Sequence, residues 1–322
     1  MYAKKHIIFI IILATTLILN GVGIAAGQSA AQTSRHPEAQ SAMRSADMYE
    51  SQPATIPAVQ PASQPAARAM RAAPPGRPII MNDSVYTSWG TPIRGASEGL
   101  EASEPSYTVT VEQLRALRDN GLNTLHLYIE HPYTGKPVGE QAEKCDQIIE
   151  DAAREGMYVI ITIGWIELMT EEDVQFFYDF WELYSKRYKD NENVIFEMAN
   201  EHNWPKNGPE VVANAYKIIR KNAPDTMVLL FSFAVSPGPE HLIPRIKDTE
   251  KLADIDWSNA AIAFHAYESE EGYFGADYLI EVIDAFTEAG YPIINTELPN
   301  RFALTSYPDM ALFRVMEERG LS

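Results

Sequence analysis

The chain has 322 residues and a net charge of -18 at pH 7. This acidic balance argues against nucleic acid and anionic membrane surfaces as partners, because most of the surface would repel a polyanion. The single cysteine, Cys145, excludes an internal disulfide, so an apolar core must hold the fold together.

The N-terminal part of the chain differs from the rest. Basic residues precede an apolar run at 7–19 and small residues follow it, which is the pattern of a secretory signal peptide over residues 1–27. A membrane anchor is the alternative, because 7–26 is just long enough to span a bilayer. Residues 28–76 are rich in Ala, Pro, Gln and Ser, which predicts a disordered linker. We therefore expect a secreted, monomeric protein with no membrane contact after cleavage and one folded domain at 77–322.

Short apolar runs alternate with longer amphipathic segments from residue 77 onward. The pattern predicts a first strand that ends near residue 97 and further strands at 123–129, 157–164, 193–201, 226–234, 260–268 and 291–298. It predicts helices at 110–121, 140–155, 171–188, 208–223, 276–290 and 309–320. Thr110 and Gln113 have the spacing of a capping box at the start of the first helix. A long loop is expected between 234 and 260.

This alternation predicts an α/β fold with a parallel sheet and crossover helices. No glycine-rich phosphate loop follows the first strand, which favours a (β/α)8 TIM barrel over an open nucleotide-binding sheet. Only seven strand and helix units are found, so we expect a barrel truncated before or at the eighth strand. In either fold the functional residues lie at the carboxyl ends of the strands.

Polar and aromatic residues gather at these predicted strand ends. They are Arg94, His126, Glu130, Trp165, Asn200, Glu201, Ser232, His265, Tyr267 and Glu297. Glu201 closes the fourth predicted strand and Glu297 the seventh, which lie on opposite sides of a narrow barrel mouth. Two carboxyl groups that flank one bond suffice for glycoside hydrolysis, one as the acid and the other as nucleophile or base. Such a site needs no metal or other cofactor.

Three motifs in this order carry a family resemblance. FEMANE at 196–201, AFHAY at 263–267 and IINTE at 293–297 resemble the clan A (β/α)8 glycoside hydrolases, most closely the cellulase-like family 5. The resemblance covers about residues 77 to 320. It implies a retaining glycosidase that acts on a β-linked polysaccharide or oligosaccharide, with Glu201 as acid/base and Glu297 as nucleophile. A carboxyl separation of roughly 5 to 5.5 Å would indicate retention, and one of roughly 6.5 to 9.5 Å inversion.

The resemblance also implies the substrate-binding residues. Asn200 matches the family's contact to the sugar 2-hydroxyl. His265 and Tyr267 match its His-x-Tyr motif, in which Tyr267 would donate a hydrogen bond to Glu297. The remaining expected contacts are Arg94, His126, Trp165 and Trp204.

Several details of this implied site are specific to the sequence. Arg94 and Glu197 resemble a buried polar pair low in the barrel. Near His126 the family has an arginine, and His202 stands where it has a proline. Trp165, Trp204 and Trp89 could stack on a sugar ring or pack loops.

Other interpretations of the same residues remain open. A non-catalytic carbohydrate-binding surface protein could use the same barrel, with Glu201 and Glu297 as ordinary strand-end carboxylates. A metal-dependent hydrolase could use His126, His131 and His265, although their spacing does not converge the imidazoles as one helix face would. The aromatic residues of the helix at 171–188 have core spacing and are expected to pack; they are Phe176, Phe177, Phe180 and Trp181.

Overall fold

A nine-stranded sheet organises the part of the chain that the structure, a computed structural model, describes. The described residues are 75–100, 108–164, 166–201, 207–234, 238–266, 276–297 and 311–322. All of them belong to one contact unit, Ala66–Ser322. The predicted signal peptide and all but the last two residues of the predicted linker lie outside them. Within these residues no helix has the length and hydrophobicity needed to cross a membrane.

Seven parallel strands form the main part of the sheet and stand side by side in chain order. They are β3 (Gly95–Gly99), β4 (Thr124–Ile129), β5 (Tyr158–Ile163), β6 (Val194–Glu197), β7 (Val228–Ala234), β8 (Ala260–His265) and β9 (Ile293–Glu297). A short antiparallel hairpin, β1 (Ile79–Met81) and β2 (Ser84–Tyr86), joins the sheet through the pairing of Ser84 with Ile293 at the start of β9.

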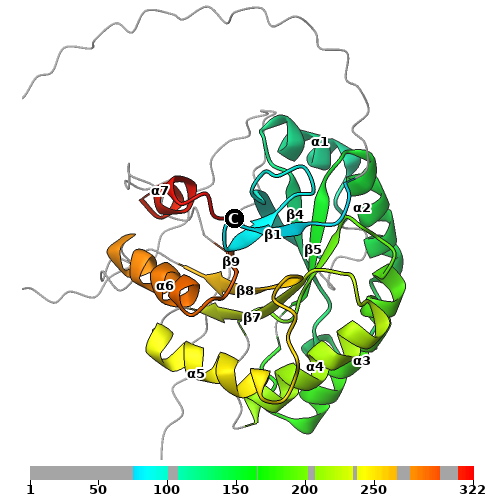
Figure 1. The fold of residues 1–322 in the computed structure, drawn as a ribbon. Helices are drawn as coiled ribbons and strands as arrows, with labels where there is room; N and C mark the ends of the chain where they lie inside the picture. The colour runs from blue at the N-terminus through cyan, green and yellow to red at the C-terminus, as the bar shows by residue number, and fades with distance from the viewer. Residues whose placement is uncertain are drawn as a thin grey trace, which may run out of the picture. The chain divides into compact units, whose positions relative to one another are not determined.

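Helices follow the strands and form an arc around the outside of the sheet (Figure 1). They are α1 (Val111–Asp119), α2 (Ala142–Arg154), α3 (Glu171–Tyr188), α4 (Gly208–Asn222), α5 (Pro239–Glu250), α6 (Ala276–Glu288) and α7 (Ala311–Glu318), with a 3-10 turn, η1 (Pro132–Thr134), after β4. The predicted capping box is confirmed, because Thr110 accepts from the Gln113 amide and Gln113 accepts from the Thr110 amide.

The long loop predicted between 234 and 260 is wrong, because α5 lies there. Pro239 is tolerated in the first turn, where the backbone N–H has no partner within the helix. Pro244 stands inside the helix, but Leu242 and Ile246 bury their side chains completely on one face. Burial of this apolar face offsets the lost hydrogen bond of one proline.

Two apolar cores lie on the two sides of the strands, because successive strand residues point to opposite faces. One core fills the inside of the curved sheet with residues such as Tyr158, Ile160 and Ile195. The larger core lies between the strands and the helices and includes Phe196 and Trp181. The predicted packing role of the α3 aromatics is confirmed, since Phe177, Phe180 and Trp181 are fully buried.

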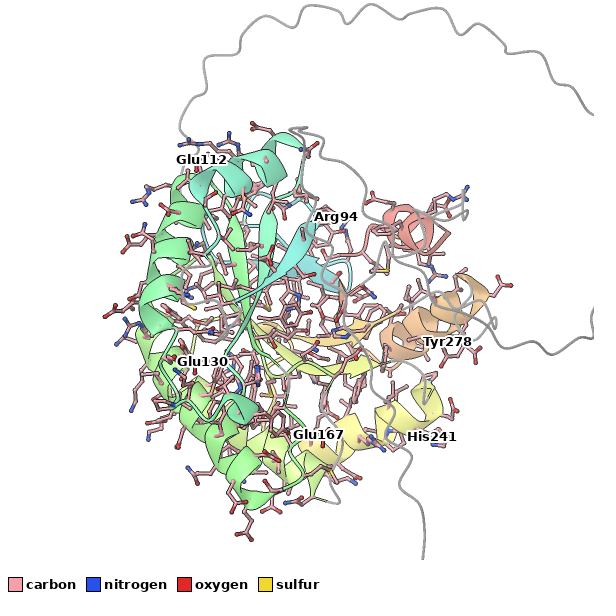
Figure 2. All side chains as sticks on the ribbon, turned by 180° about the vertical axis from the view of Figure 1, so that it is seen from behind. Arg94, Glu112, Glu130, Glu167, His241 and Tyr278 are labelled. Atoms are coloured by element: carbon pink, nitrogen blue, oxygen red, sulfur yellow. The ribbon has the colours of Figure 1, made fainter. Side chains whose placement is uncertain are left out.

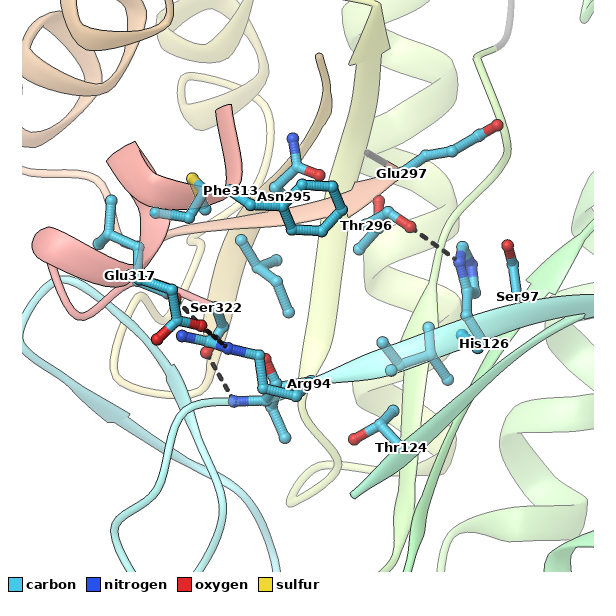
Figure 3. Close-up of a pocket in the computed structure, with 17 residues that line it drawn as sticks. Arg94, Ser97, Thr124, His126, Asn295, Thr296, Glu297, Phe313, Glu317 and Ser322 are labelled. Atoms are coloured by element: carbon cyan, nitrogen blue, oxygen red, sulfur yellow. Dashed lines mark hydrogen bonds and ion pairs between the residues drawn. The ribbon is translucent and has the colours of Figure 1, made fainter. Parts of the chain in front are cut away.

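The sheet is not closed into a barrel within the described residues. The sheet order places β3 at one end and the hairpin with β9 at the other, and β3 and β9 do not pair. Leu321 and Ser322 lie between them: Asn295 N donates to Ser322 O at 2.9 Å, and Ile93 N donates to Ser322 Oγ at 2.7 Å. A cavity of about 530 Å³ occupies the rest of this gap beside α7 (Figure 3). The predicted alternation of parallel strands and helices is confirmed, and the sheet of the described residues is open between β3 and β9.

Candidate active site

The two predicted catalytic glutamates meet at one histidine. His265 ends β8, Glu297 ends β9, and Glu201 follows β6. His265 Nδ1 lies 2.8 Å from Glu201 Oε1 and 3.2 Å from Glu297 Oε2. The imidazole is completely buried, whereas the Glu201 and Glu297 side chains are 34% and 29% exposed. The buried His265 ring therefore contacts two carboxylates that a ligand can reach from solvent.

An extra residue in β9 shapes this arrangement. Phe264 pairs with Asn295, but His265 pairs with Glu297, so Thr296 is bulged out of the register. Regular alternation would point Thr296 and Glu297 to opposite faces of the sheet. With the bulge, the Thr296 hydroxyl and the Glu297 carboxylate both contact the His265 ring.

The backbone is strained at Glu201 and at two successive residues of β7. Glu201 has a φ of +38°, and in β7 Phe231 and Ser232 have φ of +80° and +42° at a second break in register. Positive φ in residues other than glycine costs free energy and persists only where the surroundings enforce it. At this irregularity in β7 the Ser232 hydroxyl donates a hydrogen bond to the buried Glu197.

Glu197 lies fully buried directly beneath the two carboxylates. Its Oε1 accepts hydrogen bonds from Ser232 Oγ and Thr296 Oγ1, both at 2.6 Å, and lies 3.9 Å from His265 Nε2. Its Oε2 is in ion-pair contact with His126 Nε2. Burial by itself would raise the pKa of Glu197, but the adjacent His126 and His265 rings outweigh it and hold the pKa well below its usual range.

The predicted pair of Arg94 with Glu197 is wrong. Arg94 Nε instead donates to Glu317 of α7 at 2.7 Å (Figure 3), and its Nη1 donates to the Leu321 carbonyl at 2.8 Å. The side chain of Arg94 is 27% exposed in the gap between β3 and β9. A guanidinium needs several acceptors, and the C-terminal segment supplies them.

His126 takes the place beside Glu197 that was expected for Arg94. Its Nδ1 donates to the Thr296 carbonyl at 3.1 Å, and its Nε2 faces Glu197. The ring is only about 5% exposed, so His126 lies beneath the open surface of the site. Its predicted role as a direct substrate contact is untested.

The pKa of His265 is raised to about 9. Burial by itself would lower it, because a desolvated imidazolium is unfavourable. Hydrogen bonding to Glu197 and Glu201 and the charge of Glu297 outweigh that burial. His265 therefore carries a positive charge at neutral pH.

Asn200 and Tyr128 complete the described site. Asn200 Oδ1 is buried and has no hydrogen-bond partner within the described residues, so it is available to a ligand hydroxyl. Tyr128 donates from its hydroxyl to Glu297 Oε2 at 3.2 Å. The sequence reasoning missed Tyr128, although it lies two residues after His126 in β4 and therefore faces the same side.

Three of the predicted binding residues, Trp165, Trp204 and Tyr267, lie outside the described residues. Trp89 belongs to the described residues but lies outside the site. Its ring lies 5.6 Å from that of Tyr158, which begins β5, whereas the site lies where the strands end.

Glu130 ends β4 but does not join the site. It accepts hydrogen bonds from the backbone amides of Gly139 and Gln141, at 3.0 and 3.1 Å, and from the Tyr184 hydroxyl. Its side chain therefore holds the loop before α2 against α3 and has a structural role.

One group of side chains in the described part of the chain could hold a metal ion. Glu201, His265 and Glu297 each offer a ligand atom, and these atoms lie within 4.8 Å of one another. His126 and His131 do not belong to this group, so the ligand set of the metal-dependent alternative is not assembled. In the described geometry the His265 ring already contacts both carboxylates as a cation.

A parallel α/β barrel with two facing glutamates at the ends of its strands is the arrangement of glycoside hydrolases. The chain belongs to glycosyl hydrolase family 5, because the cellulase model of this family matches residues 87–301.

Curated relatives with sequence similarity are endoglucanases. Endoglucanase A of Butyrivibrio fibrisolvens is 36% identical over 110 residues, which are 31% of this chain and 25% of the relative. Endoglucanase A of Evansella cellulosilytica is 26% identical over 177 residues, 51% of this chain and 34% of the relative. The matched regions thus span a quarter to a third of the length of these relatives.

Solved structures share the fold. The catalytic domain of Thermobifida fusca endoglucanase Cel5A superposes with a TM-score of 0.57 at 19% identity, covering 76% of this chain and 83% of that one. A β-mannanase from Thermomonospora fusca has the same TM-score at 12% identity, covering 77% and 82%. At these identities the similarity establishes the barrel fold alone.

Proposed function

We propose that this protein is a retaining glycoside hydrolase that cleaves β-linked glucan or mannan chains. The observation that carries the proposal is the closeness of Glu201 and Glu297, whose nearest oxygens lie within 4.8 Å of each other. This upper limit lies below the roughly 6.5 to 9.5 Å of inverting enzymes, which favours the shorter spacing, roughly 5 to 5.5 Å, of retaining ones. Family membership and relatives named endoglucanase and β-mannanase support the class of substrate.

The proposed mechanism is a double displacement. Glu201 gives its proton to the departing glycosidic oxygen while a Glu297 oxygen attacks the anomeric carbon, which forms a glycosyl ester. Glu201, now a carboxylate, takes a proton from water, and the water oxygen displaces Glu297 from the sugar. Each turnover returns both glutamates to their starting protonation states.

Neighbouring side chains support these roles. The Tyr128 hydroxyl donates to Glu297 Oε2, and His265 Nδ1 is in ion-pair contact with the same oxygen, which holds that carboxylate in place. Asn200 Oδ1 has no hydrogen-bond partner among the described residues, so it fits the proposed hydrogen bond to the sugar 2-hydroxyl. Secretion, a monomeric state and sugar contacts from Arg94 and the two tryptophans outside the described residues remain proposals.

Hydrolysis of aryl β-glycosides, soluble β-glucans and mannans tests the proposal. We expect activity in the wild type and loss of about 10⁴-fold or more in Glu297→Ala, with partial return when azide replaces the missing nucleophile. Glu112→Ala, which removes an exposed carboxylate from α1 far from the site (Figure 2), should keep wild-type activity.

Two outcomes would contradict it. Activity that survives in Glu297→Ala would remove this residue from the reaction. Binding of glycans by the wild type without any cleavage would favour the carbohydrate-binding alternative.

A further inference from the structure

Beneath the two proposed catalytic carboxylates lies a third one that the double displacement does not use. Glu197 is fully buried, and four polar side chains surround it. Burying a carboxylate is costly unless partners compensate for the lost water. A third buried carboxylate so near two others needs a reason, and its contacts supply one.

Thr296 connects Glu197 to His265. A threonine hydroxyl has one hydrogen to donate, and the carboxylate of Glu197 at 2.6 Å can only accept it. The hydroxyl oxygen therefore presents lone pairs to His265 Nε2, 3.1 Å away, and this ring nitrogen must donate. The orientation of Thr296 thus requires a hydrogen on Nε2.

The other ring nitrogen of His265 faces the carboxylates. Nδ1 lies 2.8 Å from Glu201 Oε1 and 3.2 Å from Glu297 Oε2, so with Glu297 ionised it must donate as well. Both ring nitrogens then carry hydrogen, and the ring is an imidazolium. Among the described residues, Glu197 is the carboxylate that lies on the Nε2 side.

We propose that Glu197 is a positioning residue: acting through the Thr296 hydroxyl, it keeps His265 an imidazolium whose Nδ1–H is held between Glu201 and Glu297. The proposal rests on the proposed function of these two glutamates. The imidazolium stabilises the Glu297 carboxylate before the first step and the Glu201 carboxylate after it has given up its proton. His265 neither gains nor loses a proton during the reaction. When Glu297 becomes an ester, the Nδ1–H of His265 stays hydrogen-bonded to Glu201.

Within the described part of the chain, the charged and titratable groups around His265 come from three strands and the residues that follow them. Glu197 and Glu201 come from β6 and the residues that follow it, His126 and Tyr128 from β4, and Glu297 from β9. Of these groups, Glu197 alone is both anionic and fully buried. Removing its charge should therefore change the proton affinity of His265 without exposing the site.

Glu197→Gln in the full chain tests this, with the titration of His265 followed by ¹H–¹⁵N NMR of its ring. The amide oxygen keeps an acceptor for Ser232 and Thr296, while the NH2 group removes the charge and replaces the oxygen that faces His126. We expect the midpoint of His265 to fall from about 9 by more than about one pH unit. Glu130→Gln is the matched control, because it also neutralises a buried strand-end glutamate, and it should leave the midpoint unchanged.

Thr296 supplies a second, milder pair of variants in case Glu197→Gln does not fold. Thr296→Val removes the hydroxyl at nearly constant volume and should also lower the His265 midpoint, whereas Thr296→Ser should restore it. A midpoint equal to that of the wild type in either Glu197→Gln or Thr296→Val would overturn the proposal.

Activity gives an independent readout. In Glu197→Gln the alkaline limb of the pH profile of kcat/KM, which reports loss of the Glu201 proton, should move to lower pH because a neighbouring negative charge is removed, whereas a merely structural loss would lower the whole profile without moving it. A wild type that cleaves no glycan would refute the proposed function, while the NMR titration would still decide the role of Glu197.

Discussion

His265 shows how strongly one buried residue can tie stability to pH. Its folded-state pKa of about 9 lies above the ordinary value of 6.5. A raised pKa means that the folded state binds the proton more tightly than the unfolded state does. The resulting stabilisation is fully present below pH 6.5 and is lost as pH rises through 9.

We therefore expect the free energy of unfolding to fall between pH 6.5 and pH 9 in the wild type. At about 1.4 kcal/mol per pKa unit, the loss is about 3 kcal/mol. Urea titrations at several pH values would measure it, and His265→Gln should show a flatter dependence over the same range. Parallel curves for the two proteins would rule out His265 as the source.

Single residues of the site differ in how far the sequence could place them. Glu201, Glu297 and His265 could be placed because each ends a strand or follows one closely, and the ends of parallel strands meet. Arg94 could not, because its partner, Glu317, lies 223 positions along the chain. Which acceptor a long side chain reaches depends on which helix packs beside it, and strand patterns carry no such information.

Among the elements, β9 departs from regular strand geometry. Nothing in the residues IINTE marks an irregularity, yet the bulge at Thr296 brings two successive side chains to the same histidine. Bulges arise from the fit between neighbouring strands, so one strand's own sequence does not reveal them. The buried network around Glu197 depends on this irregularity.

Helix α3 connects the outer layer to the site. The Trp181 indole nitrogen donates to the Met198 carbonyl at 3.0 Å, two residues before Asn200. The rings of Phe180 and Trp181 lie edge to face with centroids 5.0 Å apart. Packing of α3 therefore helps to fix the segment that carries Asn200 and Glu201.

At this scale we expect Phe180→Ala to lower the free energy of unfolding by about 3–5 kcal/mol, because the fully buried ring leaves a cavity. Denaturant unfolding followed by tryptophan fluorescence would measure the loss. Phe176→Ala, on the same helix but half-buried, is the control and should cost clearly less. Equal losses in the two variants would contradict the assignment of Phe180 to the core.

In the molecule as a whole, the strands are unequally protected. Strand β5 is buried along its full length and pairs with β4 and β6. Strand β3 pairs with β4 alone and is half-exposed or exposed at every residue. Amides exchange through local opening, and strands with few buried contacts open most easily.

Hydrogen exchange followed by mass spectrometry should therefore show the slowest exchange in β5 and β6 and the fastest, among the parallel strands, in β3. Peptides that cover β4 serve as an internal reference, because this strand pairs on both sides. Protection of β3 equal to that of β5 would mean that its open edge is covered in solution.

The sequence by itself determined the order of the parallel strands and helices and placed two glutamates at or just after the ends of two strands. These follow from local periodicity and from the rule that parallel strands align their carboxyl ends. Only the tertiary structure decided that His265 contacts both glutamates, that His126 rather than Arg94 accompanies Glu197, and that Thr296 turns inward. Those outcomes depend on register between strands and on packing between distant segments, and both are set by the free energy of the whole fold.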